Sequence, residues 1–148
     1  MDKNMEMGFR CFSIYYNMCK PVCHQFNLPQ TAFDILMFLG NHPKYKTAGD
    51  IVRIRRIKAN LVSINVDKLV HEGYLLREAV EGDRRKTGLL LTDKAQSLIQ
   101  KGNEIQTLFI QNLFDGIQPD EKEIFFKTIH KLEENLEHMK GCLVWKFY

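Results

Sequence analysis

Features that this 148-residue sequence lacks already narrow its function. No stretch approaches the ~20 consecutive apolar residues that a membrane-spanning helix needs. The first ten residues mix acidic, basic and apolar side chains, which is unlike a secretory signal peptide. The sequence therefore predicts a cytoplasmic protein that has no membrane partner.

The sequence also has no tract rich in Gly, Ser or Pro and no block of like charges. Apolar residues make up 45% and charged residues 26% of the chain, which are the proportions of a globular protein. A chain of this length buries roughly two-thirds of its unfolded surface when it folds. We predict a single domain over residues 1–148.

Motifs of catalysis are missing as well. The sequence contains no Gly-rich phosphate loop, no HExxH or CxxC motif and no nucleophile elbow. The five histidines are scattered without the spacing of metal ligands. We predict that the chain is not an enzyme and that it has no cofactor and no metal.

Cysteine is scarce, with four residues in the chain. Cys11, Cys19 and Cys23 fall in the first helical segment, and Cys142 lies near the end of the sequence. A reducing cytosol argues against structural disulfides, so we predict free thiols. Cys19, Cys23 and His24 could bind a metal from one helix face. The alternative is that the two cysteines are small buried residues and that His24 lies at the surface.

The charged residues are distributed unevenly along the chain. Residues 44–86 contain eleven basic and six acidic residues, a net charge of +5, whereas the remainder of the chain carries −2. A basic middle segment suits the neutralisation of nucleic-acid phosphates. A solvated Lys/Arg surface is the alternative interpretation.

Apolar periodicity predicts helices at the start of the chain. The first helix is expected over about residues 7–26, where Pro21 should kink or interrupt it. Leu28-Pro29-Gln30 then begins a second helix, because proline suits the first helical turn, and this helix ends near Gly40.

A helix-turn-helix is predicted next. Thr47 followed three residues later by Asp50 is a capping box, which starts a short helix over about residues 47–53. After a tight turn, a longer helix over residues 58–72 ends before Gly73. Two helices joined in this way form a helix-turn-helix.

Beyond this motif the periodicity changes to that of strands. Residues 74–80 and 89–91 read as two strands, and residues 81–86 read as the polar tip of the hairpin between them. Thr92 starts a long helix to about Phe114, and Pro119 opens a final helix. The predicted fold is mainly α with a small β-wing: a winged helix-turn-helix with about six helices and a two-stranded hairpin.

These patterns resemble the MarR family, the regulators named for multiple antibiotic resistance. Asp83-Arg84-Arg85, followed by Leu91-Thr92 at the family's spacing, is similar to the family's wing pattern. The buried frame of the helix-turn-helix and the starts of the second and sixth helices also match in order. The matching positions are Ile51, Val52, Val62, Val66, Leu69 and Gly73, together with Leu28-Pro29-Gln30 and Pro119-Asp120-Glu121.

The resemblance implies an intertwined homodimer that grips duplex DNA at a pseudo-palindromic operator. The dimerisation helices would comprise residues 7–27 and 93–148, and the DNA-binding lobe would comprise about residues 29–92. The apolar tail, residues 142–148, should pack against the partner or fold back on its own subunit.

The resemblance also assigns DNA contacts. Arg85 would enter the minor groove, Asp83 would hold it in place, and Arg84 and Lys86 would lie near phosphates. Lys46 and Thr47 would bind a phosphate with a lysine and a helix N-terminus. The alternative is that residues 84–86 form only a soluble hairpin tip.

On the recognition helix, Val62, Val66 and Leu69 should point inward. Asp67 also points outward, and the candidate DNA contacts are the other outward residues of this segment (Lys58, Asn60, Leu61, Ser63, Ile64 and Lys68). Asn60 is the expected reader of adenine. Leu61 and Ile64 depart from the family, where these positions are commonly polar, so they contact thymine methyl groups or the assumed register is off by one.

The expected function is a repressor that a small aromatic or anionic effector releases from DNA. Tyr15, Tyr16, Phe38 and His42 could line the effector site, or they could be ordinary core residues. A second hypothesis is redox sensing by Cys11, since Cys11-Phe12-x-x-Tyr15 is similar to the peroxide-sensing segment of one branch of the family. A third is a winged-helix module that contacts proteins and does not bind DNA.

Overall fold

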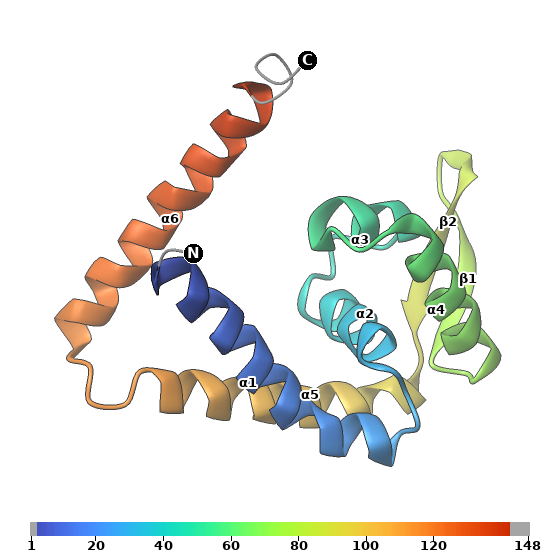
Figure 1. Ribbon diagram of the computed structural model, residues 1–148. Coiled ribbons are helices and arrows are strands. Elements are labelled where there is room, and N and C mark those ends of the chain that lie inside the picture. Colours follow the sequence, from blue (N-terminus) through green and yellow to red (C-terminus); the bar gives the residue numbers. More distant parts are fainter. Residues whose placement is uncertain (1–2, 143–148) are drawn as a thin grey trace. The chain divides into compact units, whose positions relative to one another are not determined.

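The computed structural model describes residues 3–142, so the predicted apolar tail from residue 143 onward lies outside the described residues. Six helices and a two-stranded antiparallel hairpin follow one another, as predicted (Figure 1). Their bounds are α1 Lys3–Gln25, α2 Gln30–Asn41, α3 Ala48–Arg55, α4 Ala59–His71, β1 Leu75–Val80, β2 Asp83–Leu91, α5 Asp93–Leu113 and α6 Pro119–Cys142. None of the helices within residues 3–142 combines the length and the hydropathy that a membrane crossing requires.

The chain forms two compact units, of which the first extends to Phe109 and the second begins at Ile110. The core of the first unit is built around α2. Every residue from Ala32 to Leu39 is buried, because α2 contacts α1, α4 and β2. The amphipathic frame of the helix-turn-helix completes this core with Ile51, Val62 and Leu69.

A close approach of α5 to α2 depends on Gly102. A Cβ atom added at Gly102 would lie 2.2 Å from the sulfur of Met37 and 3.1 Å from the ring of Phe33. Both distances are shorter than ordinary van der Waals contact. The absence of a side chain at Gly102 therefore lets the middle of α5 pack directly on the buried face of α2.

Of the two effects predicted for Pro21, a kink or an interruption, the interruption does not occur. Helix α1 continues from Lys3 to Gln25 with Pro21 inside it. A proline removes one backbone donor and strains the preceding turn. Here Cys19 and Cys23, on either side of Pro21, are buried in the core of the unit, and this packing holds the last turn of α1 in helical form.

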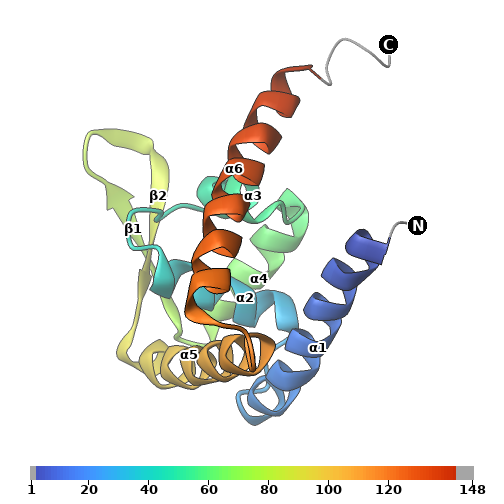
Figure 2. The same ribbon diagram turned by 90° about the vertical axis from the view of Figure 1, so that its left-hand side faces the viewer.

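The wing also differs from the prediction in its tip. Strand β2 begins at Asp83, so residues 83–86 belong to a strand and only Glu81 and Gly82 form the turn. Gly82 has a φ of 83°, a conformation that glycine adopts without strain, and this allows the tight reversal. The register of the pairing between β1 and β2 shifts between Ala79 and Val80 of β1. In Figures 1 and 2 the hairpin projects beyond α3 and α4.

The second unit contains the end of α5 and helix α6. Phe114, between the two helices, is buried against Phe125 and Phe126, with both ring centroids 5.3 Å away. Helix α6 begins at Pro119 as predicted, and the carboxylate of Glu121 accepts a hydrogen bond from the backbone N–H of Gln118 (2.9 Å). This hydrogen bond satisfies one of the free donors at the helix start.

Candidate nucleic-acid interface and effector pocket

The predicted capping box is present at the start of α3. The Thr47 hydroxyl accepts a hydrogen bond from the backbone N–H of Asp50 (3.1 Å), and the Asp50 carboxylate accepts from the backbone N–H of Thr47 (3.1 Å). The same carboxylate also accepts from the backbone N–H of Lys46 (3.2 Å). A DNA phosphate at this site would compete with Asp50 for these two amides, whereas the exposed Lys46 side chain stays available.

The predicted orientation of the recognition helix α4 is confirmed. Val62, Val66 and Leu69 are buried, and they hold α4 against the core. The register is therefore the one predicted, with Leu61 42% and Ile64 63% exposed on the outer surface. The other predicted contacts also lie on this surface, exposed except for the partly buried Lys68 (Lys58, Asn60, Ser63 and Lys68).

Two ion pairs on α4 were not predicted from the sequence. Asp67 pairs with Arg77 of β1, which ties the recognition helix to the wing. Lys68 pairs with Glu72 one turn later (2.6 Å). Both pairs are partly exposed, so each stabilises the fold only weakly. Their effect is on position, because the first fixes the wing relative to α4 and the second draws Lys68 toward its own helix.

Asp83 organises the tip of the wing. Its carboxylate accepts a hydrogen bond from the backbone N–H of Arg85 (3.0 Å), and its other oxygen lies 3.7 Å from the ammonium group of Lys86. Asp83 thus holds the Arg85 backbone and leaves the exposed guanidinium of Arg85 free to reach outward. The structure does not describe the side chain of Arg84.

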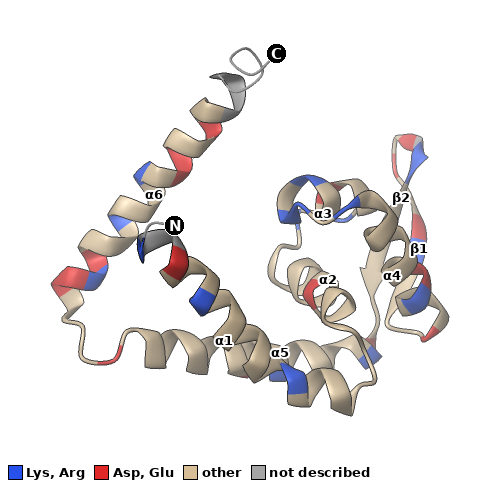
Figure 3. Cartoon of the chain, in the orientation of Figure 1, with Lys and Arg blue, Asp and Glu red and all other residues tan. Residues whose placement is uncertain are grey.

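Several basic residues lie on α3 and the wing, where Figure 3 shows blue segments. Several acidic residues of the same region are already paired with neighbouring basic groups. Within the described residues, Lys46, Lys58 and Arg85 are exposed and have no carboxylate within 4 Å. Lys44 and Arg56 are likewise exposed and have no ion pair among the described residues, so these five cations are all available to phosphates.

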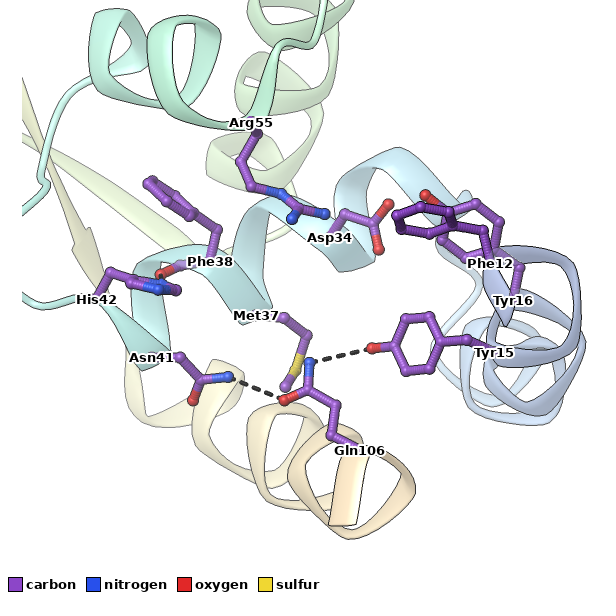
Figure 4. Close-up of a pocket in the computed structure, with 10 residues that line it drawn as sticks. All are labelled: Phe12, Tyr15, Tyr16, Asp34, Met37, Phe38, Asn41, His42, Arg55 and Gln106. Atoms are coloured by element: carbon purple, nitrogen blue, oxygen red, sulfur yellow. Dashed lines mark hydrogen bonds between the residues drawn. The ribbon is translucent and has the colours of Figure 1, made fainter. Parts of the chain in front are cut away.

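The four aromatic residues predicted for the effector site line one pocket. Figure 4 shows this pocket, which α1, α2, α3 and α5 surround and which has a volume of about 150 Å³. We call it the aromatic pocket. Its lining residues are Phe12, Tyr15, Tyr16, Asp34, Met37, Phe38, Asn41, His42, Arg55 and Gln106.

Hydrogen bonds fix one wall of the aromatic pocket. The side-chain amide of Gln106 donates to the hydroxyl of Tyr15 (3.0 Å), and its carbonyl oxygen accepts from the side-chain amide of Asn41 (3.2 Å). Figure 4 shows this bridge between α5, α1 and α2. Burial of the Tyr15 hydroxyl raises its pKa well above the usual value, so the phenol stays protonated and neutral.

Aromatic stacking connects the pocket to the helix-turn-helix. The ring of Phe38 stacks on His42 (5.0 Å between centroids) and on Tyr45 (5.7 Å). The guanidinium of Arg53 on α3 lies 5.7 Å from the centroid of the Tyr45 ring. A change in the pocket can thus reach α3 through contiguous side chains.

Comparison with known proteins relates part of the chain to one family of transcription regulators. Residues 26–86 match the model of the MarR family. Over 116 residues the chain is 28% identical to YkoM, an HTH-type transcriptional regulator of Bacillus subtilis (strain 168), and this covers 78% of the chain and 73% of YkoM. The helix-turn-helix region and the wing of the chain are therefore similar to the MarR family.

Solved structures show the same fold. The transcriptional regulator PA3341 has a TM-score of 0.80 and 21% identity, covering 93% of this chain and 99% of that one. A putative MarR-family regulator from Listeria monocytogenes, solved with a 26mer DNA, has a TM-score of 0.78 and 17% identity, covering 92% and 89%. The MarR fold therefore extends well beyond the region that matches the family model.

Two buried cysteines of α1 behave as core residues. Cys19 and Cys23 are buried, His24 is exposed, and this confirms the interpretation of the cysteines as small apolar residues. Burial raises the pKa of both thiols, that of Cys23 to about 11, so neither is a nucleophilic thiolate at neutral pH. Cys11 is a partly buried free thiol on α1, and its redox role stays a prediction.

Sequence reasoning missed Asp34, Arg55 and Gln106 in the aromatic pocket. Asp34 carried the clearest signal, because it is the one acidic residue in an otherwise apolar helix, the red segment of α2 in Figure 3. A carboxylate among buried residues needs partners. The side-chain amide of Gln30 provides one, since it donates to Asp34 Oδ1 (3.0 Å).

The pKa of Asp34 predicts a pH-dependent stability. Burial raises this pKa, and the Gln30 hydrogen bond, the Arg55 charge and the Tyr16 hydroxyl only partly offset the effect. The folded state then holds the proton more tightly than the unfolded chain, whose Asp pKa is about 3.9. The stabilisation this provides is present below that pH and is lost as pH rises through the folded pKa.

We therefore expect Asp34→Asn, which cannot ionise, to gain stability relative to the wild type as pH rises from about 4 to 7. Urea unfolding of both proteins across this range measures the difference. The near-isosteric amide can still accept a hydrogen bond from Gln30. Any change in packing therefore alters the free energy of unfolding by the same amount at every pH. A difference in free energy of unfolding that does not vary with pH would contradict the assignment.

Proposed function

We propose that this chain is a MarR-family regulator, a sequence-specific DNA-binding repressor that works as a homodimer and is released by a small effector. The observation that carries the proposal is the shared exposed surface of α3, α4 and the wing. There, unpaired cations lie beside outward-facing polar and apolar side chains of the recognition helix. Phosphates would be bound by the cations and base edges by the helix.

Each side chain has a proposed part in this interface. Arg85 enters the minor groove, and Arg84 and Lys86 contact flanking phosphates. Lys46 and Lys58 bind phosphates at the starts of α3 and α4. The L. monocytogenes structure that holds DNA has the same fold, which supports this use of the surface.

The outer face of α4 is proposed to read bases. Asn60 pairs with adenine, and Leu61 and Ile64 contact thymine methyl groups, since exposed apolar side chains in a major groove gain most from a methyl partner. Ser63 lies between them and can hydrogen-bond to either kind of base. Such a face favours an A·T-rich half-site.

To test whether Leu61 and Ile64 contact thymine methyl groups, the thymidines of the bound DNA are replaced with deoxyuridine, which lacks only the methyl group. We expect affinity to fall about fourfold for each buried methyl, since a buried CH₂ is worth about 0.8 kcal/mol. Fluorescence anisotropy measures the loss.

Leu61→Ala and Ile64→Ala should bind thymine and uracil DNA more equally, whereas Ser63→Ala is the matched control and should keep the preference. Equal affinity of the wild type for both DNAs would show that these residues do not read thymine.

A second copy of the chain is the proposed partner of α6. Five exposed apolar residues of this helix repeat with alternating spacings of four and three (Phe125, Ile129, Leu132, Leu136 and Met139), and Ile124 and Phe126 lie outside this row. We call this row the α6 seam. A heptad row of this kind is typical of helices that pair with one another. The proposal of a homodimer follows, because two such seams would cover each other.

The function is tested with DNA from upstream of the chain's own gene, compared with a scrambled duplex of equal length. We expect tighter binding to the upstream DNA and an affinity that falls steeply with salt. The cause is that each neutralised phosphate adds about 0.9 to the slope of log affinity against log salt. Several basic residues per subunit should together give a slope of several units.

The remaining alternative, a winged-helix module that contacts proteins, makes the opposite prediction. It would give a nearly flat salt slope and no preference between the two duplexes. Either result with folded protein would overturn the proposed DNA-binding function.

A further inference from the structure

The aromatic pocket contains a carboxylate that its position in α2 does not explain. Asp34 is 9% exposed within a run of eight buried residues, yet it lines the pocket. Gln30 donates to one of its oxygens (3.0 Å). In Figure 4 the carboxylate points into the space between Arg55 and the tyrosines of α1. A fixed negative charge therefore faces any molecule that enters.

The surrounding walls are aromatic. Tyr15 and Tyr16 have ring centroids 5.9 Å apart, Phe12 lies 6.4 Å from Tyr16, and Phe38 lines the opposite side. Aromatic faces attract cations through their quadrupoles. Aromatic rings around one buried carboxylate thus form an environment that favours a positive group.

We propose that the aromatic pocket binds a compact aromatic cation, such as an aryl amidine, whose positive group pairs with the Asp34 carboxylate. This inference rests on the proposed function, because it names the class of effector for the same pocket. The volume of about 150 Å³ suits a single ring, since a cavity of that size holds benzene. An amidine also matches a carboxylate with two parallel N–H donors.

Arg55 is the residue that such a ligand would displace. It is exposed, it is the last residue of α3, and its charge already acts on Asp34. A ligand cation would replace Arg55 as the positive charge beside Asp34 and would release the Arg55 side chain. Because Arg55 belongs to α3, this release connects the pocket to the helix-turn-helix. An anionic ligand could pair with Arg55 only by placing its own charge beside Asp34. The buried carboxylate therefore favours the cation over the anion that the sequence suggested.

The test measures calorimetric binding of three ligands of one shape to the full-length protein without DNA: benzamidine, neutral benzamide and anionic benzoate. We expect benzamidine to bind at least tenfold more tightly than benzoate, with benzamide between them. Asp34→Asn should lose at least tenfold in benzamidine affinity and become nearly indifferent to ligand charge. This variant removes a buried charge and keeps the shape of the side chain.

A second pair of variants does not alter the buried carboxylate. Arg55→Gln should bind benzamidine severalfold more tightly, because the competing cation is gone. Arg53→Gln is the matched control, since Arg53 lies on the same helix but pairs with Asp50, and it should bind as the wild type does. Tighter binding of benzoate than of benzamidine, no binding of any of the three ligands, or an unchanged Asp34→Asn variant would each overturn the proposal.

These measurements separate the two proposals. Protein that binds upstream DNA specifically but does not prefer benzamidine disproves the ligand class alone. Protein that prefers benzamidine but shows no specific, salt-dependent DNA binding disproves the proposed function and leaves the pocket assignment standing.

Discussion

Replacing Arg85 with alanine is expected to weaken binding to the upstream DNA by about 1 to 3 kcal/mol, a factor of about 5 to 150. The guanidinium of Arg85 is exposed and has no carboxylate partner within the described residues, so all of its hydrogen-bonding capacity is available to DNA. A narrow minor groove concentrates negative potential, which makes an inserted arginine worth more than one at a single phosphate. Anisotropy titrations at fixed salt measure the loss.

The geometry of the wing predicts that this variant stays folded. Asp83 binds the backbone N–H of Arg85, and alanine keeps that group. The pairing of β1 with β2 also does not require the Arg85 side chain. The affinity lost by Arg85→Ala is therefore attributed to DNA contact and not to collapse of the hairpin.

Arg10→Ala provides a matched control. Arg10 is an exposed arginine on α1, so its replacement changes the net charge by the same amount. We expect this variant to bind DNA nearly as the wild type does. Full affinity of a folded Arg85→Ala protein would disprove the wing assignment. Equal losses in both variants would mean that total charge, and not the wing, sets the affinity.

The elements that could be predicted from sequence are those with local causes. The capping box at Thr47 needs only residues three positions apart, and the buried face of α4 follows from a helical period. These two patterns correctly placed the helix-turn-helix. The prediction for the wing tip was wrong, because polar residues 83–86 read as a loop whereas β2 already begins at Asp83, which pairs with Val80 across the hairpin. Pairing across a hairpin outweighs local composition there.

The aromatic pocket shows more clearly what could not be predicted from the sequence. The aromatic residues predicted for the effector site line one pocket, although their part in effector binding stays a prediction, and Arg55 and Gln106 of the same pocket were not predicted. These two residues come from α3 and α5, and only the packing of four helices brings them together. The close approach at Gly102 contributes to this packing, because it places α5 against α2. No local pattern around Gln106 indicates that its amide will reach Tyr15, ninety-one positions earlier.

The α6 seam leads to the second large effect, which is expected from Leu132→Glu. Leu132 is 50% exposed in the single chain and lies in the middle of the seam. In a paired dimer, two copies of the variant would bury two unpartnered carboxylates. Burying an unpaired charged group costs several kcal/mol, so the dimer dissociation constant should rise more than a hundredfold. Sedimentation velocity at micromolar concentration should change from a dimer to a monomer.

His138→Glu controls for the new charge on the same helix. His138 is exposed and lies one position before Met139, outside the row that forms the α6 seam. This variant should sediment as a dimer, with the helical content of the wild type. A monomeric Leu132→Glu protein should also bind its operator weakly, since each subunit would then hold only one half-site and lose the gain from joint binding. A Leu132→Glu protein that is still dimeric would show that the seam faces something other than a second copy. In that case the exposed apolar residues of α1, including Phe9 and Ile14, become the next surface to examine for the dimer contact.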